Sequence, residues 1–367
     1  AAYLNDPGAS PTGHYINAST AINTSSQYPN IRLMVVGNKH DCANPIDDWS
    51  YNGTGLSVAQ PWARASASSV GSKPDVMGGA SLGDGMSATC WYFGYELHLK
   101  EDVPIGLIHS SYGGSAVEDW ISTDVLGNGE DGPCPGPIVH SMGLPSQQYN
   151  GQLHPLLNTT IKGAIWYQGE SNNGQNHLYS CRYQQMMKEW RANWYEGTGG
   201  ATDPNFPIGF VQIGPMTNGA DSYEIRMGQS ADYGYAPNKC WPNAFMATAF
   251  DLANPPNTNC ISGCIHIFNK QAVAHRLAVA ALHTVYNQTS LVYSGPRVTQ
   301  VTTSGPNEVQ LTYGGGTEGK GLLLRGTFGF QVCYQNCNLS SVAEQGECTH
   351  PLSCAQLQQQ QRIIHTT

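Results

Sequence analysis

Three groups of residues in this sequence could together catalyse acyl transfer. The first is the glycine pair Gly113 and Gly114, the second is Asn172 at the end of a Gly-Glu-Ser-Asn segment, and the third is His266. Acyl transfer needs hydrogen-bond donors aimed at a developing oxyanion, and the backbone N–H of a glycine turn and a side-chain amide can supply them. It also needs a base beside a hydroxyl nucleophile, and an imidazole suits that role. The pattern leaves the nucleophile itself unidentified.

Each group also has a structural interpretation that involves no chemistry. The glycine pair can shape a strand-to-helix turn, Asn172 can cap a helix, and His266 is one of 12 histidines. Together the three favour a site, because each follows an expected strand or precedes an expected helix, as a single pocket requires. His275 and His283 lack the i, i+4 spacing of a metal-binding pair, so we predict no metal and no cofactor.

A set of parallel strands would bring these groups together. Apolar runs typical of buried strands recur at residues 31–36, 105–109, 165–168, 206–213 and 244–250. Helical patterns cover residues 86–100, a segment capped by Ser115, a segment after Asn172 and a segment capped by Asn269. Strands that alternate with helices predict an α/β fold with a doubly wound parallel sheet, in which ligands sit beyond the carboxyl ends of the strands.

The expected helices have apolar residues at helical spacing, and these residues should be buried. They are Cys90, Phe93, Leu97 and Val103 for the first helix, Val117, Trp120 and Ile121 for the second, Tyr183, Met186, Met187, Trp190 and Trp194 for the third, and Val273, Leu277, Ala281 and Val285 for the last. After about residue 290 the pattern becomes strict alternation, at 298–302 and 309–313, which is typical of strands. We therefore predict an α/β domain over residues 1–290 and a small, cysteine-containing β module over residues 291–367.

The composition excludes some classes of partner. Charged residues are only 12% of the chain, and the net charge is -9. Nucleic acids and anionic membranes attract concentrated positive charge, and the chain has no cluster of Lys and Arg, so neither is expected as a partner. No apolar run approaches the length of a membrane span.

Cysteines and glycosylation motifs indicate a secreted, extracellular or lysosomal glycoprotein. The chain has 11 cysteines without a C-x2-C pair, so disulfides are favoured over a metal site; the close pairs are Cys260/Cys264 and Cys333/Cys337. No signal peptide starts the sequence, so we expect a mature chain or one that begins partway along a longer precursor. N-linked glycans are expected at the Asn-x-Ser/Thr motifs of Asn17, Asn23, Asn52, Asn158, Asn287 and Asn338.

The segments around the glycine pair and Asn172 resemble the sialate O-acetylesterase family of SGNH hydrolases. Residues 104–115 with Glu-Asp-Trp at 118–120, and the string Trp-Tyr-Gln-Gly-Glu-Ser-Asn at 166–172, carry the likeness, which extends over roughly residues 30–290. The resemblance implies a flavodoxin-like three-layer sandwich and an acetyl ester of a sugar such as sialic acid as substrate. It also implies that the glycine turn and Asn172 form an oxyanion hole and that His266 is the base.

Two departures from the family pattern affect the expected site. The family's nucleophile lies in a Gly-Gln-Ser-Asn-Met block before the first strand, and here the nearest counterpart is Gly8-Ala9-Ser10, followed by a proline. The nucleophile is therefore expected at Ser10, in a segment upstream of this chain, or not at all. Bacterial relatives also place an aspartate two residues before the histidine, where this chain has Cys264. Asp251 or a backbone carbonyl is then expected to orient His266, and Cys260 and Cys264 could brace the loop as a disulfide.

The leading hypothesis is a secreted carbohydrate acetylesterase that acts on O-acetylated glycans by a serine and histidine mechanism. The alternative is a catalytically inactive glycoprotein of the same fold with a structural or carbohydrate-binding role. A metal-dependent hydrolase is a third and weaker hypothesis.

Overall fold

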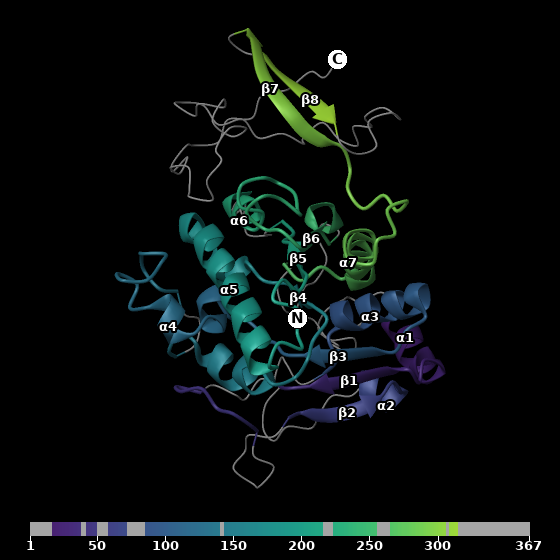
Figure 1. Ribbon diagram of the computed structural model, residues 1–367. Helices are drawn as coiled ribbons and strands as arrows, with labels where there is room; N and C mark the ends of the chain where they lie inside the picture. Colours follow the sequence, from purple (N-terminus) through teal and green to yellow (C-terminus); the bar gives the residue numbers. More distant parts are fainter. Residues whose placement is uncertain are drawn as a thin grey trace.

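The computed structural model describes residues 17–37, 42–49, 58–71, 85–139, 143–215, 223–254, 265–305 and 308–314 of the 367-residue chain (Figure 1). The strands are β1 (Ile31–Val35), β2 (Gln60–Arg64), β3 (Ile105–His109), β4 (Ala164–Trp166), β5 (Ile208–Gln212), β6 (Ala244–Thr248), β7 (Arg297–Gly305) and β8 (Glu308–Gly314). The α-helices are α1 (Ala18–Thr24), α2 (Ala67–Val70), α3 (Ala88–Glu101), α4 (Thr123–Leu126), α5 (Asn176–Gly197), α6 (Tyr223–Gly228) and α7 (Lys270–Thr284). Short 3-10 helices are η1 (Ser25–Gln27), η2 (Val117–Trp120), η4 (His154–Leu156), η5 (Glu170–Asn172) and η6 (Phe250–Leu252), and η3 (Tyr149–Leu153) is a π-helix.

The described strands form two three-stranded sheets and a hairpin. In the first sheet β1 pairs parallel with β3 and antiparallel with β2, and in the second β4, β5 and β6 are all parallel. All five predicted strands are therefore present within a mixed α/β fold. One continuous sheet was predicted, and the described strands divide instead between two, with β4 only three residues long and paired along its whole length with β5.

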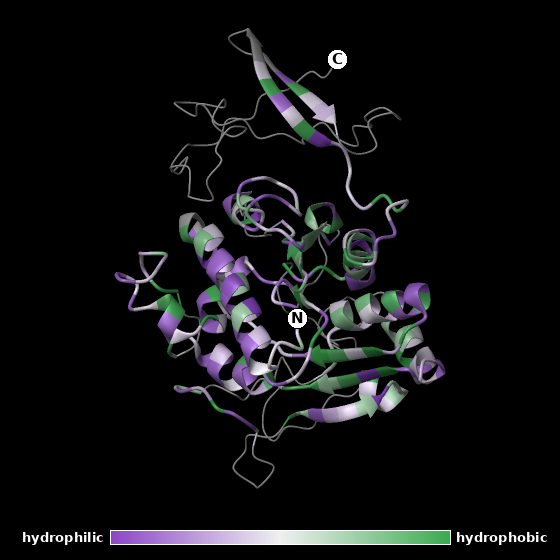
Figure 2. Ribbon diagram, in the orientation of Figure 1, coloured by the Kyte–Doolittle hydropathy of each residue, from purple (hydrophilic) through white to green (hydrophobic). Residues whose placement is uncertain are grey.

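Apolar residues cover both faces of the first sheet. Leu33 and Val35 of β1 pack in a cluster with Trp91 of α3, whereas Met34 and Val36 belong to the cluster that contains the buried face of α5. This alternation follows from the two-residue period of a strand, in which successive side chains point to opposite faces. Figure 2 shows β3 and most of β1 coloured as hydrophobic, as expected for strands that helices cover on both sides.

The second sheet is buried in the same way. Phe210 of β5 packs edge-to-face against Tyr183 of α5, with ring centroids 5.8 Å apart. Val211, the next residue, packs with Val273 and Leu277 of α7. In Figure 1, α5 and α7 accordingly lie on opposite sides of β4, β5 and β6. The carboxyl ends of the parallel strands are thus held between helices.

Helix α5 matches its prediction, α7 matches except at Val285, which follows the helix and is half-buried, and α3 differs in detail. The five expected core residues of α5 are all buried, and the Asn269 side chain caps α7 by accepting a hydrogen bond of 3.0 Å from Ala272 N–H. In α3 the residues Trp91, Tyr92 and Leu97 are buried, while Cys90 and Phe93 are only partly so. The predicted α3 face is thus confirmed at Leu97 and shifted toward Trp91 and Tyr92 at its start, and Val103, which follows the helix, is exposed.

Strands β7 and β8 form an antiparallel hairpin, which confirms the alternating pattern predicted after residue 290. Figure 1 shows the hairpin at one end of the molecule. The guanidinium of Arg297, the first residue of β7, stacks 4.4 Å from the ring centroid of Tyr235. Residues 315–367 lie outside the described residues, so the module boundary stays a prediction. Within the described part of the chain, no helix has the length and apolar character to cross a membrane.

A disulfide joins the loop after α4 to α5. Cys134 and Cys181 bond with an S–S distance of 2.02 Å, and Cys240 is also disulfide-bonded. The expectation of disulfides is thus confirmed for these residues, whereas Cys260, Cys264 and the cysteines from 333 onward lie outside the described residues.

Candidate active site

The glycine turn after β3 and the η5 segment after β4 lie against each other. Gly113 and Gly114 form an exposed turn beyond the carboxyl end of β3. The Ser171 hydroxyl donates a hydrogen bond of 2.8 Å to the carbonyl of Gly114. The Gln168 side-chain amide donates one of 3.0 Å to the carbonyl of Ser115. Two of the three predicted groups are therefore joined directly.

The backbone of the glycine turn presents two N–H donors without an acceptor among the described residues. Gly114 has a φ of 84°, a left-handed conformation that favours glycine. Neither the N–H of Gly113 nor that of Gly114 donates a hydrogen bond to a residue that the structure describes. Unpaired N–H groups in an exposed turn can bind an anion or a developing oxyanion.

A short 3-10 helix follows the turn, where the sequence predicted an α-helix capped by Ser115. This helix, η2, is four residues long. The N–H of Ala116, the residue before it, donates a hydrogen bond of 2.8 Å to Asp119 Oδ2. The Ser115 hydroxyl instead accepts from Trp120 Nε1 and donates to the carbonyl of Tyr112, each at 2.8 Å. The predicted cap was wrong, because the serine closes the glycine turn rather than the helix.

Asn172 is buried, and its partners fix the orientation of its amide. Oδ1 accepts hydrogen bonds from Val117 N–H at 2.9 Å and from Gln168 Nε2 at 2.8 Å. Nδ2 donates to Glu118 Oε2 at 2.8 Å, and its second hydrogen has no acceptor among the described residues. The residue is 1% exposed. Its role as an oxyanion donor stays a prediction, and the second hydrogen of Nδ2 is the one that could serve it.

Glu118 and Arg182 form a buried ion pair that the sequence did not reveal. Both side chains are 1% exposed, and Arg182 Nη1 binds Glu118 Oε1. The partners are 64 residues apart. An acidic residue at the start of a helix normally indicates a favourable interaction with the helix dipole, so the pattern gave no sign of a buried partner.

His266 lies in the segment before α7 and is half-buried. Its carbonyl oxygen accepts a hydrogen bond of 2.8 Å from Asn254 Nδ2, and Asn254 Oδ1 accepts one of 2.8 Å from Phe268 N–H. Asn254 thereby holds the backbone at and after His266. This fixed segment leads directly into the capped first turn of α7.

Asp251 binds a cation on α7. Its two carboxylate oxygens accept hydrogen bonds of 2.6 and 2.8 Å from Arg276, and its side chain is 59% exposed. The role predicted for Asp251 beside His266 stays a prediction. Ser10, the predicted nucleophile, and Cys264 lie outside the described residues.

Lys270 connects the start of α7 to the end of β4. This lysine, four residues after His266, is 4% exposed, and its Nζ lies 3.4 Å from the hydroxyl and 4.5 Å from the ring centroid of Tyr167. Burial lowers the pKa of Lys270 to about 8, while the Glu170 carboxylate acts in the opposite direction. Because Tyr167 leads into η5, this contact joins the first turn of α7 to the segment that carries Asn172. The position of the His266 side chain beside the other two groups stays a prediction.

His109 and Ser111 form a hydrogen-bonded pair before the glycine turn. The carbonyl of Gly85 can only accept, so His109 Nδ1, which lies 2.8 Å from it, carries the proton. His109 Nε2 then accepts from the Ser111 hydroxyl at 2.8 Å. Burial lowers the pKa of His109 to about 3, which makes it a weak base at neutral pH. The sequence gave no signal for this pair beyond its position at a strand end.

A separate pocket lies at the far end of α5. It is lined by Tyr149, His154, Asn158, Asn193 and Glu196, together with neighbouring residues. Helix α5 has 22 residues and is therefore about 33 Å long, which separates this pocket from η5. It contains none of the residues predicted for catalysis.

The remaining predictions concern metals and glycans. In the described part of the chain, no group of three or more His, Cys, Asp or Glu side chains could hold a metal ion. The described glycosylation motifs have exposed asparagines, namely Asn17, Asn23, Asn158 and Asn287. Asn52 and Asn338 lie outside the described residues.

The chain is similar to known carbohydrate esterases. The family described as carbohydrate esterase, sialic acid-specific acetylesterase, matches residues 55–260, more than half of the chain. The sialate O-acetylesterases of Mus musculus and Homo sapiens are 33% and 34% identical to this chain over 318 and 292 residues. These alignments cover 76% of this chain and 55% and 52% of the relatives, so the chain spans about half the length of the curated relatives it matches.

A solved structure is similar as well. A carbohydrate acetylesterase from Xanthomonas citri has a TM-score of 0.62 and 26% sequence identity, over 85% of this chain and 60% of that one. The family match covers β3, the glycine turn and the η5 segment, whose mutual contacts are described above. The chain therefore belongs to the family of sialic acid-specific carbohydrate acetylesterases.

Proposed function

We propose that this chain hydrolyses acetyl esters on sialic acid or a related glycan by a serine and histidine mechanism. The observation that carries the proposal is the junction between the glycine turn and η5. There Ser171 binds the carbonyl of Gly114, and the N–H groups of Gly113 and Gly114 donate to none of the described residues. Family membership and the similarity to named acetylesterases support the choice of an acetyl ester over other acyl groups.

In the first half of the reaction, a serine Oγ attacks the acetyl carbonyl carbon while the His266 imidazole accepts the hydroxyl proton. The carbonyl oxygen becomes an oxyanion, which the N–H groups of Gly113 and Gly114 bind, with Asn172 Nδ2 as a third donor. His266 then protonates the sugar oxygen, the acyl C–O bond breaks, and the sugar leaves as an alcohol. An acetyl group remains on the serine.

In the second half, a water molecule attacks the acetyl-serine, and His266 accepts its proton. Collapse of the second oxyanion releases acetate and returns the proton to the serine. The nucleophile in this proposal is Ser10 or a serine of an upstream segment, and Asp251 or a backbone carbonyl orients His266. Labelling with a serine-directed fluorophosphonate, followed by peptide mapping, distinguishes the two sources of the serine.

The finer features of the fold and of its location belong to the same proposal. We assign both three-stranded sheets to one SGNH/flavodoxin-like three-layer sandwich over residues 1–290, with a β module over 291–367. Support comes from the apolar clusters on both faces of each sheet. We also propose a secreted or lysosomal glycoprotein, which the Cys134–Cys181 disulfide and the exposed motif asparagines support.

The proposal is tested by the rate of acetate release from an O-acetylated sialoside. Loss of a general base costs about 10²- to 10⁴-fold in rate, so His266→Ala should lose at least that much. His275→Ala is the matched control, since this second histidine lies on α7, is 60% exposed and binds Glu96 at 2.7 Å. Equal rates in the two variants would remove His266 from the mechanism. Activity should persist in a chelator, and its loss there would favour a metal-dependent hydrolase.

A further inference from the structure

The ion pair between Arg182 and Glu118 is buried, so its formation carries a large desolvation cost. Both side chains are 1% exposed, and taking two charges out of water is repaid only when every polar atom is satisfied. Arg182 Nε is buried without a hydrogen-bond partner among the described residues. An apolar pair of the same volume would avoid these costs, so stability alone does not account for the pair.

Glu118 controls the orientation of Asn172 and of the start of η2. One carboxylate oxygen, Oε1, binds Arg182, and the other, Oε2, accepts the Asn172 Nδ2 hydrogen bond of 2.8 Å. Because that bond fixes which side of the amide carries nitrogen, Asn172 Oδ1 faces Val117 N–H and Gln168 Nε2. The same set of bonds therefore ties the turn after β3 to the segment after β4.

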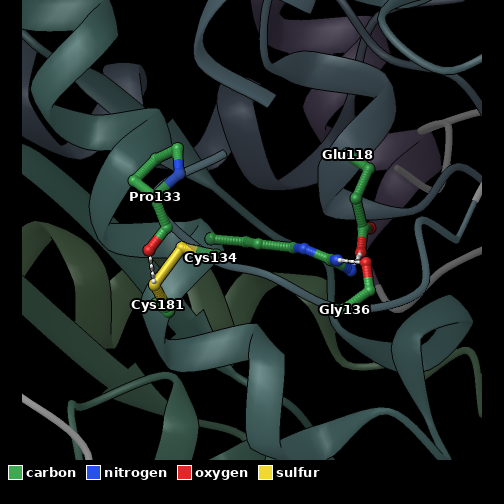
Figure 3. The surroundings of a disulfide bond; sticks show 6 residues. Glu118, Pro133, Cys134, Gly136 and Cys181 are labelled. Carbon is green, nitrogen blue, oxygen red and sulfur yellow. Dashed lines mark hydrogen bonds and ion pairs between the residues drawn. A yellow bond between two sulfur atoms is a disulfide. The ribbon is translucent and has the colours of Figure 1, made fainter. Parts of the chain in front are cut away.

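Arg182 is itself held in place by a hydrogen bond and by the disulfide of the preceding residue. Its Nη2 donates a hydrogen bond of 3.0 Å to the carbonyl of Gly136. Cys181, the preceding residue of α5, forms the disulfide with Cys134, two residues before Gly136. Figure 3 shows the disulfide on one side of the view and Glu118 and Gly136 on the other. The loop and the helix that present these groups thus cannot separate.

We propose that Arg182 is a positioning residue for the esterase reaction. Its guanidinium holds the Glu118 carboxylate in place, and Glu118 in turn holds Asn172 and the η2 backbone in the geometry that stabilises the oxyanion. The Cys134–Cys181 disulfide keeps the part of α5 that carries Arg182 next to the loop that carries Gly136. This inference rests on the proposed function, and it adds a residue that does not touch the substrate.

Kinetics of Arg182→Met test the inference. A displacement of catalytic donors by about 1 Å costs on the order of 10²-fold, so kcat should fall by about 10- to 100-fold while KM stays within about twofold. Arg191→Met is the matched control, because Arg191 also lies on α5 and binds carbonyl oxygens, those of Phe206, Pro242 and Asn243. Equal losses of kcat in both variants, or a loss confined to KM, would overturn the inference.

A double variant separates positioning from simple loss of structure. In Glu118→Gln/Arg182→Met the buried charge is gone, and the glutamine oxygen can still accept the Asn172 Nδ2 hydrogen bond. Most of the kcat lost in Arg182→Met should return. If Arg182→Met does not fold, Arg182→Lys replaces it; a lysine keeps the charge but cannot reach Glu118 and Gly136 in the same fork, so an intermediate loss is expected. No recovery in the double variant would contradict the inference.

A spectroscopic measurement tests the positioning independently of activity. The side-chain amide resonance of Asn172 should shift in Arg182→Met, return toward its original position in the double variant, and stay unchanged in Arg191→Met. Absence of acetate release from the unmodified chain would refute the proposed function, and the amide resonance would still decide the positioning. An unchanged Asn172 resonance in Arg182→Met would overturn it.

Discussion

Replacement of Asn172 by aspartate should make the stability of this protein depend strongly on pH. The substitution keeps the volume of the side chain and its acceptor Oδ1, but it exchanges a donor for a second carboxylate 2.8 Å from Glu118 Oε2. Two unit charges at that distance repel by about 6 kcal/mol at an effective dielectric constant of about 20. Because the site is 1% exposed, solvent offers little screening, and the new group should bind a proton instead.

The size of the penalty follows from the cost of that proton. An unperturbed aspartate has a pKa of about 3.9, and each pH unit above it costs about 1.4 kcal/mol to hold the proton. The folded protein binds this proton more tightly than the unfolded chain does, so the penalty is absent below about pH 4 and grows as pH rises. We expect a loss of about 1.5 kcal/mol at pH 5 and about 5.5 kcal/mol at pH 8, just below the repulsion limit.

Thermal unfolding between pH 5 and pH 8 measures this effect. For a chain of this size each kcal/mol lowers Tm by about 2–3 °C, so the deficit of Asn172→Asp should widen from about 4 °C to more than about 10 °C. The exposed Asn243, which donates through Nδ2 to the carbonyl of Asn205 at 3.0 Å, provides Asn243→Asp as the control. A pH-independent deficit, or one equal to that of the control, would refute the assignment of Asn172 to a buried carboxylate contact.

Three further predictions follow from the contacts around the site. Ser111→Ala should keep acetylesterase activity within about threefold, because a partner imidazole with a pKa of about 3 is too weak a base to activate Ser111; a loss as large as that of His266→Ala would make Ser111 the nucleophile. Replacing Cys134 and Cys181 by serine should lower the unfolding free energy by about 4 kcal/mol, the chain-entropy value for a separation of 47 residues. Denaturant unfolding measures this loss, and a loss of less than about 1 kcal/mol would contradict a native disulfide. The pKa of the buried Lys270 is lowered to about 8, so above that pH the lysine takes up a proton when the chain unfolds. The unfolding free energy should therefore rise by about 2 kcal/mol from pH 8 to 9.5, and Lys270→Met should abolish the rise. The same slope in the variant would contradict the burial of Lys270.

The long helices and the strand runs could be predicted because their signals are local. Helix α5 carries five large apolar residues at helical spacing, and all of them are buried. The Asn269 cap of α7 likewise depends on a contact only three residues away. Such features follow from periodicity and from capping chemistry, which a sequence displays directly.

The features that the sequence did not predict depend on tertiary contacts. Ser115 has the residue type of a helix cap, yet the indole of Trp120 and the carbonyl of Tyr112 engage its hydroxyl. In the same way, Glu118 finds Arg182 across 64 residues. The division of the strands between two sheets also depends on pairing of distant segments, which strand patterns alone do not specify.

For the candidate site, the structure tests the contacts between the predicted groups, and their catalytic roles stay predictions. The glycine turn and η5 are in contact, as their positions after parallel strands suggested. Asn172, however, is buried with three side-chain hydrogen bonds, and Asp251 binds Arg276. Burial and competing partners decide such roles, and neither can be read from residue type and spacing.

The central claim is that this chain transfers an acetyl group from a sugar to a serine and then to water. Rapid quenching of the intact chain with an O-acetylated sialoside, followed by mass spectrometry, measures that transfer directly. We predict a transient protein species heavier by one acetyl group on a serine, together with one acetate released for each acetyl group that the sugar loses. Absence of both the adduct and acetate release above the rate in buffer would contradict the claim.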